Sequence, residues 1–557
     1  MTTSAPASTV APAPAPVAGF HHTRHLPRLP ALASGVDRRR HAVVIAGGGP
    51  VGLAMALGLA VQGVASVVLE SDDTVCVGSR AICVSRRSLQ ILQRLGALDA
   101  FLAKGLPWRS GRSFYKTAEV LRFDMPHDEG QKLPPMLNLS QYYIEQFLVE
   151  AIGRCNAATP GLIDLRWGTA LTGFAQQSDG VHLQAANELG SYALNADWLV
   201  ACDGGQSFVR KAMGLELHGA AYEGRYVIID IALPSRHPAE RRAWFDPPWN
   251  PGSTVLMHPQ PDDIWRIDYQ LRPGQSTEEA LQPEAVRTFV QRHLDAIGEG
   301  HLPWQPVWTS VYRAGAMTLD SYRHGRVLFA GNAAHAMPIF GVRGLNSGFD
   351  DADNLAWKLA LVAQRKADAA LLDSYSHERI AAFHTNAESA MRSTEFMSPP
   401  SRGFDLLREA ALSLAERHRG IAQLVNPRQT EAVRYADSPL STPDVADLAG
   451  PGPGEVLPDR PLAQGHLLDG MGPGFTLLWL GNDDGGLQHE IHAAEQRSGL
   501  SLALRRLPAA PHGQQQACYL LRPDGHVAAR WPGAPPAGAI ARALCRAACI
   551  HHQETTA

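Results

Sequence analysis

The hydrophobic positions of this chain follow two alternating periods, one typical of strands and one typical of helices. Short apolar runs at residues 42–46 and 66–69 predict buried strands. Apolar residues at helical spacing predict helices over four segments: 51–62, 85–95, 137–153 and 283–297. Residues 223–316 are otherwise made of short apolar or alternating runs, which predict further strands. The pattern therefore predicts an α/β fold that contains a β-rich segment.

The strongest local signal is the stretch HAVVIAGGGPVGLAMALGLAVQGVASVVLE, from residue 41 to residue 70. Between its first strand and its helix it has the spacing G-x-G-x-x-G. Gly47 permits the tight turn, Gly49 lets a pyrophosphate approach the backbone, and Gly52 lets the helix pack closely. Pro50 belongs to the same loop, and Glu70 ends the second strand, where a carboxylate binds an adenosine ribose and repels a 2′-phosphate. The stretch predicts a dinucleotide site.

A membrane-spanning helix is the main alternative for this stretch, because residues 42–69 carry no formal charge. The helix-breaking run Gly-Gly-Gly-Pro at residues 47–50 disfavours that alternative. Net charge is −4 and the pI is near 6.6, so we expect neither nucleic acid nor a membrane surface as a partner. Seven cysteines without a C-x-x-C pair favour a reducing, cytoplasmic location.

The ends of the chain differ in composition from its middle. Residues 1–19 contain only small, apolar and hydroxyl residues and proline apart from Met1, and we predict a disordered Ala/Pro-rich tail over residues 1–40. Near the other end, Cys545 and Cys549 are followed by two histidines, which we interpret as a chance cluster; no metal is expected.

Two further motifs accompany the glycine stretch: C-D-G-G-Q-S-F-V-R at residues 202–210 and A-G-N-A-A-H…G-L-N-S-G at residues 330–348. Together the three motifs resemble those of the single-component (group A) FAD-dependent aromatic hydroxylases, which have the p-hydroxybenzoate hydroxylase fold. The phenol, pentachlorophenol and 3-(3-hydroxyphenyl)propionate hydroxylase branches look most similar, and the specific resemblance covers about residues 41–395.

This resemblance implies a Rossmann-like α/β FAD-binding domain, a β-rich substrate domain and a thioredoxin-like C-terminal domain. The implied boundaries are as follows: FAD-binding domain 41–222 and 317–395, substrate domain 223–316, connector 396–460, and C-terminal domain 461–557. The last domain lacks the redox cysteine pair of thioredoxins, so we expect it to serve packing or contacts within a homodimer.

The resemblance also implies which residues bind a tightly held, non-covalent FAD. Besides the glycine loop and Glu70, they are Arg80, Gln141, Asp203 and Gly204, Asn332, and the helix start at Gly344, Leu345 and Asn346. Asn332 departs from the family, which has an aspartate on the FAD ribitol at this position. Since asparagine accepts a hydrogen bond without a charge, we expect weaker FAD binding.

The implied reaction hydroxylates a small phenolic ring. NAD(P)H reduces the flavin, O2 adds to its C4a atom, and the resulting hydroperoxide attacks the ring. Only one G-x-G-x-x-G is present, so we expect no separate NAD(P)H-binding Rossmann domain. Asp350, Asp351 and Asp353, near the implied flavin-facing helix end, are expected to be capping residues.

Candidates for the substrate site come from the β-rich segment and from the loop after residue 331. The sequence DIWRIDYQL places Arg266 and Asp268 on one strand face and Tyr269 on the other. A carboxylate base of the phenol hydroxylase branch falls at Ile82 here, so the candidate bases are His258, Asp268 and Tyr269. The candidate pocket residues are Pro338, Ile339, Phe340 and Arg343, of which Arg343 has two open interpretations: binding an acidic substrate, or pairing with Asp350 or Asp351.

Two other functions fit the same motifs. The first is a flavin monooxygenase acting on a larger polyketide or antibiotic. The second is a non-catalytic FAD-binding sensor, suggested only by Asn332. The sequence does not distinguish NADH from NADPH.

Overall fold

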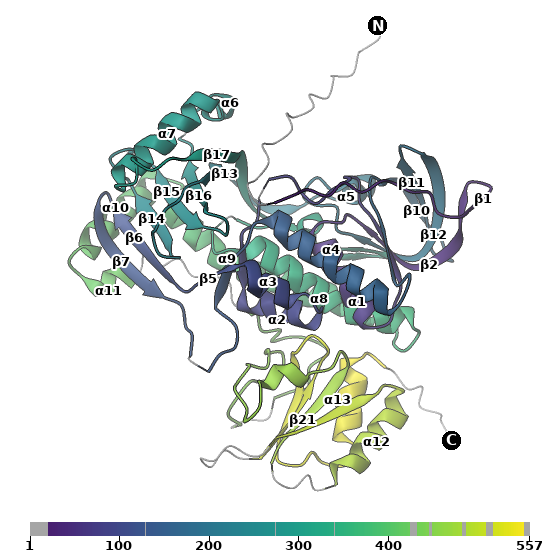
Figure 1. Cartoon of the computed structure of the whole chain (residues 1–557). Coiled ribbons are helices and arrows are strands. Elements are labelled where there is room, and N and C mark those ends of the chain that lie inside the picture. The colour runs from purple at the N-terminus through teal and green to yellow at the C-terminus, as the bar shows by residue number, and fades with distance from the viewer. Residues whose placement is uncertain are drawn as a thin grey trace.

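The computed structural model describes residues 20–78, 80–128, 130–272, 274–338, 340–423, 432–444, 448–481, 486–507 and 516–550. Its described part contains three sheets of four or more strands and one small sheet. Figure 1 shows the two largest sheets side by side, with the C-terminal unit (yellow) packed beneath the helices of the first.

The first sheet has nine strands and contains the glycine stretch. Its main order is β10-β11-β12-β2-β3-β9, with β1, β18 and β19 attached at its side. Its strands are β1 Leu32–Ala33, β2 Val36–Ala46, β3 Ser66–Leu69, β9 Ile163–Arg166, β10 Ala170–Gln176, β11 Val181–Asn187, β12 Gly190–Ala201, β18 Arg323–His324 and β19 Val327–Phe329. Strands β9, β3, β2, β12 and β19 run parallel. The central parts of three of them are fully buried, as expected for parallel strands covered on both faces: residues 43–46 of β2, all of β3, and residues 199–201 of β12.

Helices from distant parts of the chain pack on and around this sheet. They are α1 Pro50–Val61, α2 Arg86–Arg94, α3 Leu98–Lys104, α4 Gln141–Ala158, α5 Phe208–Ala212, α8 Arg343–Ala363 and α9 Leu371–Met397. The small sheet, β4 Cys83–Ser85, β5 Leu106–Trp108 and β8 Met136–Asn138, lies next to them. Helix α1 packs against both α8 and α4, because its residues from Gly52 to Ala60 are buried without interruption.

The second sheet has the order β20-β17-β13-β16-β15-β14-β6-β7. Its strands are β6 Ser110–Tyr115, β7 Ala118–Asp124, β13 His218–Ala232, β14 Arg241–Phe245, β15 Thr254–Pro259, β16 Ile264–Gln270, β17 Gln305–Thr318 and β20 His335–Ala336. One face is covered by α7 Pro283–Ala296, with the short α6 Thr277–Ala280 before it. The predicted substrate-domain range 223–316 is therefore too narrow, because β6 and β7 join this sheet from residues predicted to lie in the FAD-binding domain.

The C-terminal sheet has the order β22-β21-β23-β24, in which β21 pairs parallel with β22 and antiparallel with β23. Its elements are β21 Phe475–Leu480, α12 Leu487–Ser498, β22 Leu502–Leu507, β23 Ala517–Leu521, β24 Val527–Pro532 and α13 Ala539–Ala547. This arrangement agrees with the predicted thioredoxin-like fold. The predicted hairpin at Asp524-Gly525 is confirmed, with Gly525 at a φ of +81°.

The segment predicted as a connector contains α10 Arg402–Ala415 and the short α11 Arg419–Ala422. Leu412 and Ala415 of α10 are buried against the second sheet, in the same cluster as Phe245.

Residues 20–40 correct the prediction of a disordered tail, whereas residues 1–19 lie outside the described residues. The Phe20 ring packs on Tyr142 and Tyr143 of α4 at centroid distances of 4.5 and 4.8 Å, and β2 begins at Val36. The Ala/Pro-rich composition of residues 1–19 was wrongly extended to residues 20–40, which pack on the domain through the aromatic ring of Phe20.

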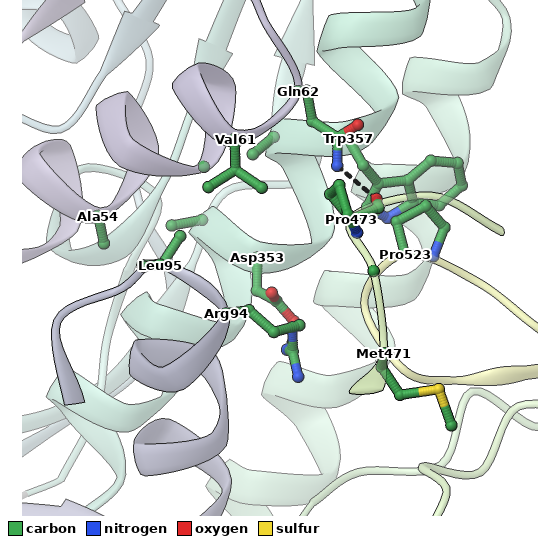
Figure 2. A pocket seen from close by; sticks show the side chains of 14 residues that line it. Ala54, Val61, Gln62, Arg94, Leu95, Asp353, Trp357, Met471, Pro473 and Pro523 are labelled. Atoms are coloured by element: carbon green, nitrogen blue, oxygen red, sulfur yellow. Dashed lines mark hydrogen bonds and ion pairs between the residues drawn. The ribbon is translucent and has the colours of Figure 1, made fainter. Parts of the chain in front are cut away.

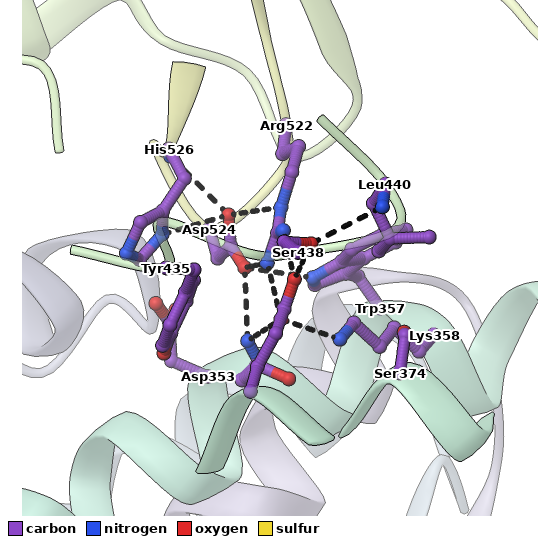
Figure 3. Close-up of polar contacts among 12 residues, drawn as sticks. Asp353, Trp357, Lys358, Ser374, Tyr435, Ser438, Leu440, Arg522, Asp524 and His526 are labelled. Atoms are coloured by element: carbon purple, nitrogen blue, oxygen red, sulfur yellow. Dashed lines mark hydrogen bonds and ion pairs between the residues drawn. The ribbon is translucent and has the colours of Figure 1, made fainter. Parts of the chain in front are cut away.

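Polar contacts, drawn in Figure 3, and an aromatic pair attach the C-terminal unit to α8 and α9. Glu378 of α9 accepts hydrogen bonds from Lys358 Nζ at 2.7 Å and from Arg522 Nη2 at 3.0 Å. The Trp357 ring lies edge-to-face with Phe475 at 5.6 Å. Because these groups are almost fully buried, the two units share an interior at this junction.

No helix within the described ranges combines the length and the apolar character needed to cross a membrane.

Candidate active site

The glycine loop between β2 and α1 has the geometry that its spacing predicts. Gly47 has a φ of +99°, and a Cβ there would lie 2.5 Å from the Cys202 carbonyl oxygen. A Cβ on Gly52 would lie 2.0 Å from the Gly47 carbonyl oxygen. A Cβ on Gly49, in contrast, would meet no described atom within 4 Å. Gly47 and Gly52 are required by packing, and Gly49 leaves open space.

Helix α1 begins with Pro50 in its first turn, and no side chain caps this end within the described structure. Its first N–H groups therefore face the open space beside Gly49 and are available to a phosphate. Glu70 Oε2 accepts a hydrogen bond from Gly48 N at 2.6 Å. Burial raises the pKa of Glu70, and the backbone N–H groups of Asp72 and Gly48 oppose that rise. The carboxylate predicted to bind the ribose thus lies beside the glycine loop.

The second motif lies against the first. Asp203 follows β12, and its Oδ2 accepts a hydrogen bond from Val209 N at 3.0 Å. Its Oδ1 is buried and has no hydrogen-bond partner among the described residues. Gly204 has a φ of +76°, which favours glycine. Arg210 then donates to the carbonyl oxygens of Gly205 at 2.6 Å and Ala333 at 2.9 Å, so it joins the second motif to the third.

The third motif packs against Val51, in the first turn of α1. Cβ atoms added to Gly331 and Gly348 would lie 2.9 and 2.5 Å from Val51 Cγ2. Asn332, next to Gly331, is exposed, and its carbonyl oxygen lies 3.5 Å from Arg210 Nη1. Three stretches that are far apart in sequence therefore converge at one end of α1.

Helix α8 starts at Arg343, after Val342 in the left-handed region at a φ of 55°. This conformation is unusual for a β-branched residue and marks a constrained turn. Gly344 and Leu345 are partly exposed. The Asn346 side chain accepts from Ser85 N at 2.9 Å, which ties the start of α8 to the small sheet. Its backbone remains the predicted flavin contact.

The three aspartates of α8 are not capping residues, because the helix begins about two turns before them. Asp350 and Asp353 form ion pairs with Arg87 at 3.1 and 2.9 Å. Asp351 accepts from His335 Nε2 and Arg379 Nε, both at 2.7 Å. Long-range partners that local spacing does not reveal therefore explain these acids.

Arg80 and Gln141 lie at the loop that precedes β4. Gln141 Oε1 accepts from Ala81 N at 3.0 Å, and Gln141 Nε2 donates to Glu145 Oε1 at 3.0 Å. The Arg80 side chain is exposed, and its carbonyl oxygen accepts from Arg266 Nη1 at 2.8 Å. Gln141 therefore shapes the loop that presents Arg80.

One face of the second sheet carries a buried polar group of residues. Arg266 makes a two-point ion pair with Asp230, at 2.8 and 2.9 Å. Asp268 Oδ1 and His258 Nδ1 are buried without a hydrogen-bond partner in the described ranges, and His258 Nε2 lies 3.9 Å from Asp268 Oδ2. Burial raises the pKa of Asp268 to about 7. Burial, with Arg241 and Arg266, holds the pKa of His258 well below its usual value, so its ring is neutral.

Tyr269 lies apart from this group, on the face that packs against α7. Its ring stacks on Phe289 at a centroid distance of 3.9 Å. The geometry brings Asp268 and His258 together and separates Tyr269 from both.

The predicted pocket residues lie near the same sheet face. Phe340 is 2% exposed and packs edge-to-face on Tyr226 at 5.2 Å, and Pro338 is buried as well. Ile339 lies outside the described residues. Arg343 is buried, and its Nε donates a hydrogen bond to Asn386 Oδ1 at 3.3 Å. Asp350 and Asp351, the two acids considered as its partners, are paired with Arg87 and Arg379.

Arg241 is the most prominent residue that sequence reasoning missed. It opens β14 within Arg-Arg-Ala-Trp-Phe and is 4% exposed. Strand alternation indicates that only one of the two arginines faces the Asp268 side, but the sequence gives no register to say which.

A pocket between α1, α8 and the C-terminal unit contains none of the predicted site residues (Figure 2). It is lined by the later part of α1, including Val61, together with Gln62, Trp357 and Pro473. It belongs to the junction of the two units.

The loops at the start of α1 define a dinucleotide-binding site of the flavoprotein class. Two observations fit FAD there: the open space at Gly49 beside an uncapped helix end, and the buried, unpartnered Oδ1 of Asp203. Residues 40–390 match the family model described as "FAD binding domain", and the chain belongs to this family.

Relatives with curated names include the 3-(3-hydroxy-phenyl)propionate/3-hydroxycinnamic acid hydroxylase of Escherichia coli strain K12. It is 32% identical over 368 residues, which cover 66% of this chain and 64% of the relative. The protein of the same name from Escherichia coli O157:H7 is 32% identical over 369 residues. The chain thus matches somewhat less than two thirds of the length of these relatives.

Solved structures support the fold. The flavin-dependent monooxygenase PieE, in complex with FAD and substrate, aligns with a TM-score of 0.77 at 24% identity, covering 92% of this chain and 99% of that chain. Aklavinone-11 hydroxylase with FAD and aklavinone gives 0.74 at 22% identity, covering 92% and 100%. p-Nitrophenol 4-monooxygenase PnpA from Pseudomonas putida DLL-E4 gives 0.59 at 25% identity, covering 70% and 99%.

Proposed function

We propose that this protein is an FAD-dependent monooxygenase that hydroxylates a small phenolic ring with NAD(P)H and O2. The observation that carries the proposal is the convergence of the three motifs at one end of α1. A second observation adds to it: on a buried sheet face, Asp268 Oδ1 has no hydrogen-bond partner among the described residues. Membership of the FAD-binding family and the hydroxylase names of relatives at 32% identity support it.

The protein's own residues have three tasks in this reaction, and bound FAD supplies the oxygen activation. The start of α8, at Gly344 to Asn346, directs backbone N–H groups and a positive helix end towards charge that develops on the cofactor. Phe340 and Tyr226 supply apolar surface that excludes water near the ring. Asp268 accepts the phenolic proton, because an electron-rich phenolate reacts more readily than the phenol.

The pH profile tests the role of Asp268. With a pKa of about 7, its carboxyl is protonated at lower pH and cannot accept a proton, so kcat/KM is expected to rise as pH passes through 7. Asp268→Asn should abolish this rise and lower kcat/KM about 100-fold above pH 7. Steady-state kinetics on FAD-loaded protein measure both effects. Asp263→Asn, at an exposed turn before the same strand, is the control, and an unchanged profile in Asp268→Asn would contradict the assignment.

FAD retention tests Asn332. Asn332→Asp is expected to slow FAD release about 10-fold, because a charge-assisted hydrogen bond to the cofactor replaces a neutral one. Flavin fluorescence after dilution measures release, and Gln177→Glu adds the same charge at an exposed, distant hairpin. Equal release rates for Asn332→Asp and the unmodified protein would count against a cofactor contact at this position.

Reduced-nucleotide oxidation tests the function as a whole. Purified protein with FAD is mixed with NADH or NADPH and a panel of phenols, hydroxybenzoates and hydroxyphenyl acids, while oxygen uptake is recorded. We expect one class of ring to stimulate uptake and to yield a product heavier by one oxygen atom. A protein that binds FAD and is not stimulated by any ring would instead support the sensor function.

A further inference from the structure

The guanidinium of Arg241 is a buried cation whose partner is missing. Its Nε and Nη1 atoms are buried and have no hydrogen-bond partner in the part of the chain that the structure describes. Leaving a buried charge uncompensated is costly, whereas a bound anion removes that cost. Arg242, the next residue, has its Nε bonded to Glu240 Oε1 at 2.9 Å, so the two adjacent arginines differ in this respect.

Strand register places Arg241 on the sheet face that carries His258 and Asp268. Arg242 pairs with Met257 across β14 and β15, so Arg241 stands beside His258, and His258 pairs in turn with Arg266. Neighbours across strands point to the same face. Arg241, His258 and Arg266 therefore form a row across three strands.

The other groups of this face leave the charge of Arg241 unneutralised. The charges of Arg266 and Asp230 cancel in their two-point ion pair. His258 is neutral, since its pKa is lowered. Asp268 makes no ion pair with Arg241 among the described contacts, and its raised pKa keeps it partly protonated at neutral pH. This face consequently has a net positive charge.

The position of Arg241 connects it to the candidate active site. Its charge acts on Cys83 of β4, and the Cys83 carbonyl oxygen accepts from Asn346 Nδ2 at 3.1 Å. Asn346 lies in the first turn of α8, the helix end predicted to face the flavin. The neighbouring cluster of Ile82, Cys83 and Val342 is apolar. An anion that reaches Arg241 would hence lie beside an apolar surface and near the start of α8.

We propose that Arg241 is the anion receptor of the substrate pocket and that the ring accepted by this protein carries a carboxylate side chain. The inference rests on the proposed function and specifies its substrate class. A guanidinium binds a carboxylate through two parallel N–H···O bonds, which fixes the direction of the ring as well as its affinity. With the carboxylate on Arg241, the apolar ring lies along the Ile82 and Val342 surface and its hydroxyl group points to Asp268.

Ligand binding to the oxidised, FAD-loaded protein tests this inference without turnover. The probes are 3-(3-hydroxyphenyl)propionate and 3-hydroxyphenylacetate, each compared with its primary amide, and Kd is read from the change in flavin absorbance. We expect the unmodified protein to bind an acid about 10- to 100-fold more tightly than its amide, as for loss of a hydrogen bond to a charged group. Arg241→Met should remove this preference by weakening the acid while leaving the amide unchanged.

Arg242→Met is the matched control, since it removes a neighbouring buried guanidinium that already has a partner; the preference for the acid should persist. Arg241→Lys keeps the positive charge but cannot form two parallel hydrogen bonds to a carboxylate, so we expect a reduced preference for the acid over the amide. If Arg241→Met does not retain FAD, the preference measured for Arg241→Lys tests the proposal instead. Equal affinity for acid and amide in the unmodified protein, absence of binding by either acid, or an unchanged preference in both Arg241 variants would overturn the proposal. Selective binding of the acid without any hydroxylation would contradict the proposed function and support the receptor.

Discussion

Gly49→Ala is expected to give a folded protein that has lost its FAD. The alanine Cβ would meet no described atom within 4 Å, and the Gly49 backbone, at a φ of −72° and ψ of −175°, suits any residue. The same Cβ would project into the open space beside the α1 N-terminus, where the pyrophosphate must approach the backbone. We expect FAD affinity to fall on the order of 100-fold, corresponding to the cost of overpacking. Stability of the apoprotein should change by less than about 1 kcal/mol.

Two other glycines make this prediction specific. Gly52→Ala would place its Cβ 2.0 Å from a backbone oxygen, so it should lower both FAD content and the midpoint of thermal unfolding. Gly153→Ala, in α4, also has open space around the added methyl group and should retain FAD. Flavin absorbance and circular dichroism on the three variants separate the effects. If Gly49→Ala binds FAD as tightly as Gly153→Ala does, the pyrophosphate does not pass Gly49.

Local sequence patterns predicted the elements whose formation depends on local chemistry. The β2–α1–β3 unit was predictable because the glycines serve its turn and because residues 42–46 and 66–69 are almost entirely apolar. The structure places β3 at Ser66–Leu69 as expected, whereas β2 begins earlier, at Val36, in a charged stretch that the apolar pattern did not reveal. The hairpin at Asp524-Gly525 was predictable for the same reason, since a turn with positive φ favours this dipeptide. Convergence of the three motifs followed from a resemblance to a family and not from any local pattern.

The missed features depend on partners that are distant in sequence. Asp350 and Asp351 pair with arginines and do not cap a helix, because α2 and α9 bring Arg87 and Arg379 next to them. The local sequence around the two aspartates does not show these helices. The role proposed for Arg241 follows from two guanidinium nitrogens that have no hydrogen-bond partner among the described residues, and this can be seen only once the sheet is packed. Strands β6 and β7 joined the second sheet through a parallel pairing of β6 with β14, about 130 residues away in sequence, as the register indicates.

Glu378→Ala is expected to be the most destabilising single change at the junction with the C-terminal unit. Glu378 is 1% exposed and accepts hydrogen bonds from Lys358, Arg522 and Asn354. Burial alone would raise its pKa, but Arg522 and Lys358 outweigh burial and hold that pKa below its ordinary value. Removing the carboxylate leaves the buried Lys358 without this counter-ion and leaves Arg522 with Asp524 alone, which costs about 3–5 kcal/mol. The midpoint of urea unfolding, followed by tryptophan fluorescence, measures the loss.

Glu388→Ala is the control on the same helix, because the side chains of Glu388 and its partner Arg392 are 63% and 71% exposed. Such a surface pair contributes about 0–1 kcal/mol, so its removal should barely move the midpoint.

Arg522 belongs to the C-terminal unit and Lys358 to α8, so the loss of Glu378 should also increase proteolytic cleavage within residues 396–460. Equal midpoints for Glu378→Ala and Glu388→Ala would mean that apolar contacts such as that of Trp357 with Phe475 hold the junction without the ionic network. The start of α8, where the flavin contact is predicted, and its middle, where the C-terminal unit is anchored, belong to one helix, so the same variant should also release FAD faster.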